Sequence, residues 1–397
     1  MKPFASLKIY PRPDSEYKSK SSLDFQRVLG NLYGQRPTGS VVQAYLWVLC
    51  FIVGMTMGIL AFLLDLLVEN LIHVRWHVTE AVVRSANNPL LGLPIILGFS
   101  VVFVMIGSGL TAYLSPQAAG SGVAETMGIL NGVKYPDFIT IQALIVKFFG
   151  VALGVSGGLT IGKEGPLVHM GAIVGQAIPY LPLGISKYFR NDFEKRKLLA
   201  VGVASGVSAA FGAPIGGALF AYELSKPNTF WSFSLTWKVF FASTIATFTL
   251  SIFKQIQEGV HLHVSSSDII KLGNTQSAPT LDSLFGALVI GVIGGLLGAV
   301  FIRFNNQVNV VRKKLLKTNN RKIIETLVLT VVTVTVMYMA ITINYWGAGD
   351  SYQTDKNFCD FKNETLKDNS TMPVPTIQFL CEDDARFDRL ATLLFDT

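Results

Sequence analysis

The sequence predicts an all-α, polytopic membrane protein whose helices are interrupted by glycine-framed polar breaks. Of the 397 residues, 50% are hydrophobic and only 15% are charged, and the mean hydropathy is +0.45. With such a composition, a soluble domain would have to expose large apolar patches to water. Uncharged runs long enough to cross a bilayer core of about 30 Å alternate with short basic loops. This pattern indicates one helical membrane domain.

The first uncharged run, Val41 to Leu64, is long enough to span the bilayer, and the polar residues before it contain no signal-peptide core. We expect a cytosolic segment at residues 1–40, a membrane domain at residues 41–346 and a polar lumenal segment at residues 347–397. The uneven lengths of the later runs and their frequent glycines favour broken or half helices over simple perpendicular spans. These runs are Leu90 to Val123, Ile139 to Ile161, Leu167 to Leu183, Leu198 to Tyr222, Phe230 to Phe253, Leu281 to Ile302 and Ile323 to Trp346.

The basic residues predict the orientation of the chain. The net charge is +7, and the positive residues gather in two short loops that should face the cytosol together with the N-terminal segment. A nucleic-acid partner is not expected from this distribution. The two loops contain Lys187, Arg190, Lys195, Arg196 and Lys197, and Arg303, Arg312, Lys313, Lys314, Lys317, Arg321 and Lys322. Glycosylation sequons at Asn363 and Asn369, with Cys359 and Cys381 nearby, place the polar tail on the opposite, lumenal side.

Two polar breaks carry the candidate chemistry. Gly162-Lys163-Glu164-Gly165-Pro166 puts two charged residues between apolar runs, where each charge costs about 2.5–3.5 kcal/mol on insertion scales. Gly120-Ser121-Gly122 repeats this design upstream. A helix N-terminus offers unpaired N–H groups and about half a positive charge, which hold an anion weakly enough to release it. Glycine lets the backbone approach, Ser121 adds a hydroxyl donor and Pro166 fits a first helical turn. The breaks therefore predict an anion pathway, with a pair of tight membrane turns as the alternative.

Lys147 supports the anion pathway, whereas the sequence lacks the motifs that would indicate an enzyme. Lys147 lies well inside the run from Ile139 to Ile161, which favours a supporting charge over a side chain that reaches the interface. The stretch from Gly157 to Lys163 resembles the start of a nucleotide-binding loop, but Glu164 stands where a Mg²⁺-binding Ser or Thr is needed. The sequence has no H-E-x-x-H motif, and His169 is expected to be a hydrogen-bonded helix residue rather than a ligand. We therefore expect no enzymatic activity, no cofactor and no metal site.

With these residues in view, the chain resembles the CLC family of chloride channels and proton-coupled chloride exchangers. Gly120 to Ala124 is similar to the family's G-S-G-I-P motif, Gly162 to Pro166 to its G-K/R-E-G-P motif, and Gly212 to Phe220 to its next signature helix. Three further stretches look most like the late-endosomal and lysosomal branch of eukaryotic members: Leu130 to Lys134, Gly206 to Gly217 and Leu235 to Phe241.

The resemblance implies a multi-pass homodimer of inverted-repeat helical halves in an endosomal or lysosomal membrane, with chloride as the transported ligand. Ser121 would coordinate the central anion, and Glu164 would be the gating glutamate. Ala124 replaces the motif proline, and Leu224 replaces the second of two glutamates with which the exchangers relay protons. The remaining residues of the implied anion site are Gly120, Gly122, Gly162, Lys163, Gly165 and Lys147.

The same resemblance implies that the chain ends near the middle of the family fold, so that we expect little flux from the 397 residues alone. Three hypotheses stay open. Leu224 favours a voltage-gated chloride channel or another uncoupled anion conductor. Glu164 and the branch-specific stretches favour a chloride/proton antiporter. The third hypothesis is a truncated, non-conducting protein that associates with a full-length partner.

Overall fold

The computed structural model describes residues 40–86, 89–133, 135, 137–181, 189, 192–226, 231–258, 281–347, 359–361 and 386–388. The chain divides between Trp47 and Val48 into two units, and apart from the first residues of one helix the description below concerns the second, larger unit. Several predicted features lie outside the described residues: most of the N-terminal segment, Lys187 and Arg190 of the first basic loop, the sequons at Asn363 and Asn369, and Cys381.

The described chain is almost entirely helical, which confirms the predicted all-α membrane fold. Five stretches are long and apolar enough to cross a bilayer: Val42–Val83, Gly92–Leu114, Phe233–Gln257, Phe285–Leu315 and Asn319–Thr342. In chain order the helices are α2 (Ser40–Ala86), α3 (Gly92–Gly109), α4 (Val123–Leu130), α5 (Ile141–Ser156), α6 (Glu164–Ala177), α7 (Asp192–Phe211), α8 (Pro214–Ser225), α9 (Phe233–Glu258), α10 (Leu281–Leu315) and α11 (Asn319–Gly347).

Three details differ from the sequence prediction. The first helix continues beyond the uncharged run to Ala86, and Asp65 and Arg75 on this extension are buried. The run from Leu198 to Tyr222 is broken at Gly212, whose φ of +62° ends α7 before Pro214 begins α8. The polar tail, for which no strand was expected, contributes two short antiparallel strands, β1 (Cys359–Phe361) and β2 (Arg386–Asp388).

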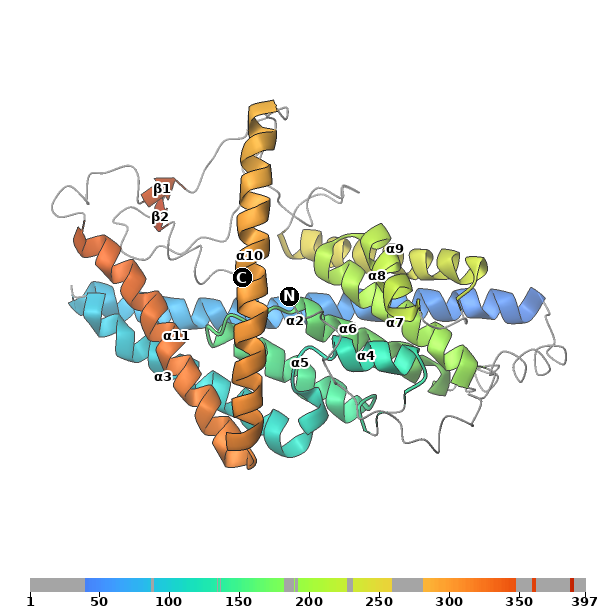
Figure 1. Cartoon of the computed structure of the whole chain (residues 1–397), viewed down its shortest axis with the longest axis horizontal. Helices are drawn as coiled ribbons and strands as arrows, with labels where there is room; N and C mark the ends of the chain where they lie inside the picture. The colour runs from blue at the N-terminus through green and yellow to red at the C-terminus, as the bar shows by residue number, and fades with distance from the viewer. Residues whose placement is uncertain are drawn as a thin grey trace, which may run out of the picture. The chain divides into compact units, whose positions relative to one another are not determined.

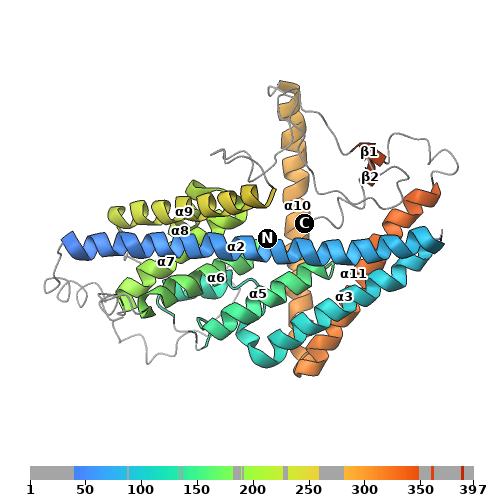
Figure 2. The ribbon, with the colours of Figure 1, turned by 180° about the vertical axis from the view of Figure 1, so that it is seen from behind.

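Helices α6 and α7 pack backbone against backbone, and both views show them side by side (Figures 1 and 2). A Cβ atom added at Gly171 would collide with the carbonyl oxygen of Gly202, and one added at Gly202 would collide with that of Gly171. Gly175 and Gly206 make the same kind of contact with the carbonyls of Leu198 and Leu167. Glycines spaced four apart on both helices therefore permit the close approach, which fixes α6, the helix that begins at the charged break.

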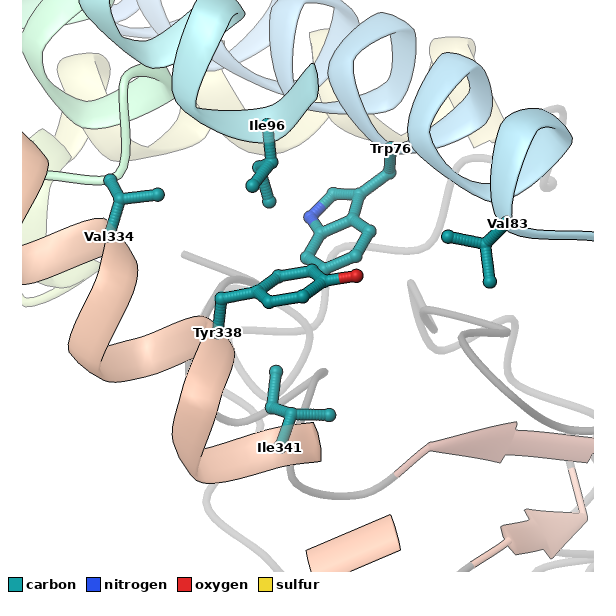
Figure 3. Close-up of a cluster of buried hydrophobic side chains, with 6 residues drawn as sticks. All are labelled: Trp76, Val83, Ile96, Val334, Tyr338 and Ile341. Carbon is teal, nitrogen blue, oxygen red and sulfur yellow. The ribbon is translucent and has the colours of Figure 1, made fainter. Parts of the chain in front are cut away.

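A second packing centre joins α2, α3 and α11. Six buried side chains from these helices form one cluster, in which the Tyr338 ring of α11 lies beside Trp76 with its hydroxyl end toward Val83 (Figure 3). Its members are Trp76, Val83, Ile96, Val334, Tyr338 and Ile341. Gly92, at the start of α3, has no room for a side chain because the Tyr338 hydroxyl occupies that space. The cluster holds α3 and α11 together at one wall of the cavity described below.

Helix α10 contrasts with these packed elements. Its apolar residues are largely exposed, for example Leu288 at 62%, Val300 at 66% and Phe301 at 67%. A helix of this length that is apolar on all sides is stable in hydrocarbon and unstable in water, as a membrane span should be. Near the C-terminal end of α10, the Arg312 guanidinium donates two hydrogen bonds to the Glu325 carboxylate of α11, at 2.5 and 2.9 Å.

Candidate functional site

The two glycine-framed breaks meet in the structure, although they lie about forty residues apart in the sequence. Helix α4 begins directly after Gly122, whose φ is +81°, and helix α6 begins at Glu164. A Cβ atom at Gly165 would lie 2.7 Å from the Cβ of Ser121. The first turn of α6 thus touches the turn before α4, so two positive helix ends converge on one place.

A cavity of about 560 Å³ opens at this junction. Its lining includes both breaks through Gly120, Ser121, Gly162 and Pro166, and the buried Lys147 of α5 reaches it from the side. The far wall comes from α10 and α11 and adds Arg312, Lys322 and Glu325. The cavity combines free backbone N–H groups with an excess of positive side chains, which suits a small anion.

Ser121 and Glu164 lie at the N-terminal ends of α4 and α6. The Ser121 side chain is exposed, and its Oγ accepts a long hydrogen bond of 3.4 Å from the Val123 N–H at the start of α4. The Glu164 carboxylate folds back over Gly162, where it fills the space that a Cβ atom would need. A carboxylate in this place can occupy the position of an anion at the α6 N-terminus.

Lys147 lies within α5 and is only 2% exposed. Its ammonium hydrogen-bonds the Nδ1 atom of His169 at 2.8 Å, and the Nε2 atom of His169 bonds the carbonyl oxygen of Phe138 at 2.9 Å. His169 therefore uses both ring nitrogens, as expected for a hydrogen-bonded helix residue. The sequence did not show that its partner is Lys147.

Lys163 has a different partner, which sequence analysis missed. Its Nζ lies 2.6 Å from Oδ1 of Asp65 on α2, and Lys254 of α9 approaches the other carboxylate oxygen at 2.8 Å. The Asp65 side chain is only 10% exposed. An isolated acid at the end of the first apolar run was the available signal, because a charge at that depth needs a partner.

Leu224, which stands at the proton-relay position implied by the family resemblance, is buried on α8, at 9% exposure. Its carbonyl oxygen accepts a hydrogen bond of 2.9 Å from the Asn131 side-chain amide. The neighbouring Glu223 is exposed and pairs with Lys226 at 3.6 Å. Adjacent helix residues point about 100° apart. The Glu223 carboxylate therefore faces away from the buried side of α8 on which Leu224 lies.

These features define a class of protein: a polytopic helical membrane protein with a cationic cavity at two converging helix N-termini. The sequence profile of the voltage gated chloride channel family matches residues 103–380. The chain therefore belongs to this family, as its motifs indicated.

Curated relatives agree with this assignment. The H(+)/Cl(-) exchange transporter 7 of Homo sapiens is 37% identical over 308 residues, which cover 74% of this chain and 38% of that protein. Chloride channel protein C of Dictyostelium discoideum is 33% identical and covers 88% of this chain and 45% of its own length. The chain thus spans less than half of either relative. The likeness to exchange transporter 7 supports the late-endosomal and lysosomal branch that the local sequence indicated.

Solved structures show the same fold. A crystal structure of a eukaryotic CLC transporter superposes with a TM-score of 0.61 at 24% identity, over 77% of this chain and 52% of the other. A slow cyanobacterial Cl⁻/H⁺ antiporter gives a TM-score of 0.58 at 25% identity, over 73% of this chain and 63% of the other.

Proposed function

We propose that this protein takes part in chloride transport across an intracellular membrane through a pathway that Glu164 gates. The convergence of the Gly120-Ser121-Gly122 turn with the α6 N-terminus carries the proposal, because it presents backbone donors and a hydroxyl to one cavity. Such donors bind an anion without trapping it in a full ion pair. The family assignment and the names of the relatives support chloride as the anion.

The pathway is proposed to open when the Glu164 carboxylate leaves the helix end. The carboxylate now lies over Gly162, beside the cavity that Ser121 and Lys147 line. While it is ionised it competes with chloride for the same donors, and protonation removes that competition. Gating by a side chain that mimics the transported ion needs no large movement of the helices.

An uncoupled channel is the first candidate mode, and exchange against protons is the second. Leu224 is buried and cannot bind a proton, which favours the channel. The antiporter is favoured by Glu164 and by the names of the exchange transporters to which the chain is similar. We further propose a multi-pass protein of endosomal or lysosomal membranes that has a cytosolic N-terminus and acts as a homodimer. A third candidate is a non-conducting chain that associates with a longer partner.

Flux measurements in liposomes distinguish these modes. The longest form of the chain that its transcript encodes is reconstituted, and chloride efflux is followed while a pH-sensitive dye reports proton movement inside. We expect chloride flux without coupled proton movement. Uphill proton movement in fixed proportion to chloride would establish the antiporter. Absence of all chloride flux would overturn the proposed transport and favour the third candidate, a non-conducting chain that associates with a longer partner.

Leu224→Glu tests the reason for the missing coupling. We expect this variant to create or strengthen proton movement driven by a chloride gradient, because it restores a titratable group at the buried position. Leu224→Ala is the matched control and should leave proton movement absent. If the Glu and Ala variants behave alike, position 224 is not part of a proton route.

A further inference from the structure

The hydrogen bonds of His169 determine its chemical state. The Lys147 ammonium can only donate, so the Nδ1 atom that it contacts at 2.8 Å must accept. The Phe138 carbonyl can only accept, so the Nε2 atom at 2.9 Å must carry the proton. The Phe138 ring stacks on the imidazole with the centroids 3.8 Å apart and fixes its plane. His169 is therefore a neutral imidazole in the Nε2–H form.

A neutral partner leaves the charge of Lys147 uncompensated. In the described part of the chain no carboxylate lies within ion-pair distance of Lys147, and Glu125 acts on it only from farther away. The imidazole supplies the acceptor that a buried ammonium needs but adds no negative charge. The positive potential of Lys147 thus remains directed at the cavity that it lines with Ser121.

His169 also supports the turn that carries Ser121. A Cβ atom at Gly122 would lie 2.9 Å from the Cβ, Cγ and Nδ1 atoms of His169. The imidazole is fully buried behind this glycine, and α6 holds it there. One side chain therefore contacts both the buried cation and the glycine next to the anion-binding hydroxyl.

We propose that His169 is a positioning residue for anion binding: it holds the Lys147 ammonium beside the cavity without neutralising it. This inference rests on the proposed function, since it assumes that chloride binds between Ser121 and Lys147. The nature of the acceptor then decides anion affinity. An uncharged acceptor at position 169 preserves the positive potential, whereas a carboxylate there cancels it through an ion pair.

The test compares His169→Gln with His169→Glu, two side chains of nearly equal shape that both offer an oxygen to Lys147. Chloride binding is measured by calorimetric titration of the purified chain in lipid nanodiscs, and thermal unfolding confirms that both variants are folded. We expect the Gln variant to bind chloride within about threefold of the wild type and the Glu variant to bind at least about tenfold more weakly. In ¹⁵N spectra of histidine-labelled wild type, His169 should show a proton on Nε2 and none on Nδ1.

Each other result has a definite meaning. Equal chloride affinity in the folded Gln and Glu variants, with normal binding in the wild type, would overturn the positioning role and leave the proposed function intact. A proton on Nδ1 of His169 would likewise overturn it, because Nδ1 could then not accept a hydrogen bond from a charged Lys147 ammonium. Absence of chloride binding in the wild type itself would overturn the proposed site and this inference together.

Discussion

Two lysines flank the site, and their surroundings differ in charge. Lys163, next to Glu164, donates a hydrogen bond from its ammonium to Asp65 at 2.6 Å and shares that carboxylate with Lys254. Lys147, behind the cavity, gives its ammonium to the neutral ring of His169 at 2.8 Å. The first lysine is paired with an acid, which it shares with Lys254, whereas in the described part of the chain the second has no acid within ion-pair distance.

The comparison teaches that the group that accepts the hydrogen bond of a lysine decides its role. A lysine on a carboxylate stabilises the fold, whereas a lysine on a neutral ring keeps its charge for binding an anion. Lys163 joins three elements, since its partner Asp65 lies on α2 and Lys254 lies on α9. Lys147 is 2% exposed and contributes a net charge to the cavity. We infer that the ion cluster around Asp65 stabilises the fold, whereas Lys147 attracts the anion.

The largest expected effect on binding comes from Lys147→Met, which keeps the length of the side chain and removes its charge. We expect chloride affinity to fall by about tenfold to a hundredfold, equivalent to about 1.4–2.8 kcal/mol. Lys163→Met is the matched comparison and should lower affinity less, because Lys163 is paired with Asp65 and does not line the cavity. Calorimetric chloride titration of both variants provides the measurement, and an equal loss in the two would erase the distinction between the lysines.

Asp65→Asn tests the structural side of the comparison. The substitution leaves two ammonium groups close together without the negative charge that they share, although their side chains are 31% and 33% exposed. Loss of a fully buried pair costs about 3–5 kcal/mol, and solvent screening should reduce this to about 1–3 kcal/mol. The melting temperature should therefore drop, while chloride affinity of the folded protein changes little. Unaltered melting with weaker chloride binding would reverse the roles given to the two regions.

The smallest expected effect is a change of preference at Ser121. Ser121→Pro removes the hydroxyl donor and reshapes the backbone before α4, so nitrate permeation should rise relative to chloride. Relative permeation is measured with both anions in the same proteoliposomes, which contain the longest form of the chain that its transcript encodes. Ser121→Ala is the matched comparison, because it removes the hydroxyl alone. An unchanged ratio in both variants would make Ser121 a turn residue only.

The sequence predicted the architecture because hydropathy and glycine placement act locally. Uncharged runs became helices, and the glycine-framed breaks became helix ends at Gly122 and before Glu164. The closest helix contact was not predicted, although its signal was present: Gly171 with Gly175 and Gly202 with Gly206 follow the G-x-x-x-G spacing of closely packed membrane helices.

The partners of the charged residues were beyond sequence reasoning. Asp65 and Lys163 lie 98 residues apart, and Lys147 and His169 lie 22 apart on different helices. Such pairs depend on how the helices cross, which periodicity does not specify. The roles assigned to the site residues remain predictions.

The most direct test of the account is the pH dependence of chloride flux in Glu164→Gln, which mimics the protonated gate. Glu223→Gln is the control, since it makes the same change on the exposed side of α8. Flux of the longest form of the chain that its transcript encodes is measured in proteoliposomes between about pH 3 and 7.5, a range that brackets the ordinary titration of a carboxylate. The account predicts chloride flux that persists in Glu164→Gln and no longer varies with pH, while the control behaves as the wild type. Flux in Glu164→Gln with the pH dependence of the wild type would contradict the gating role of Glu164.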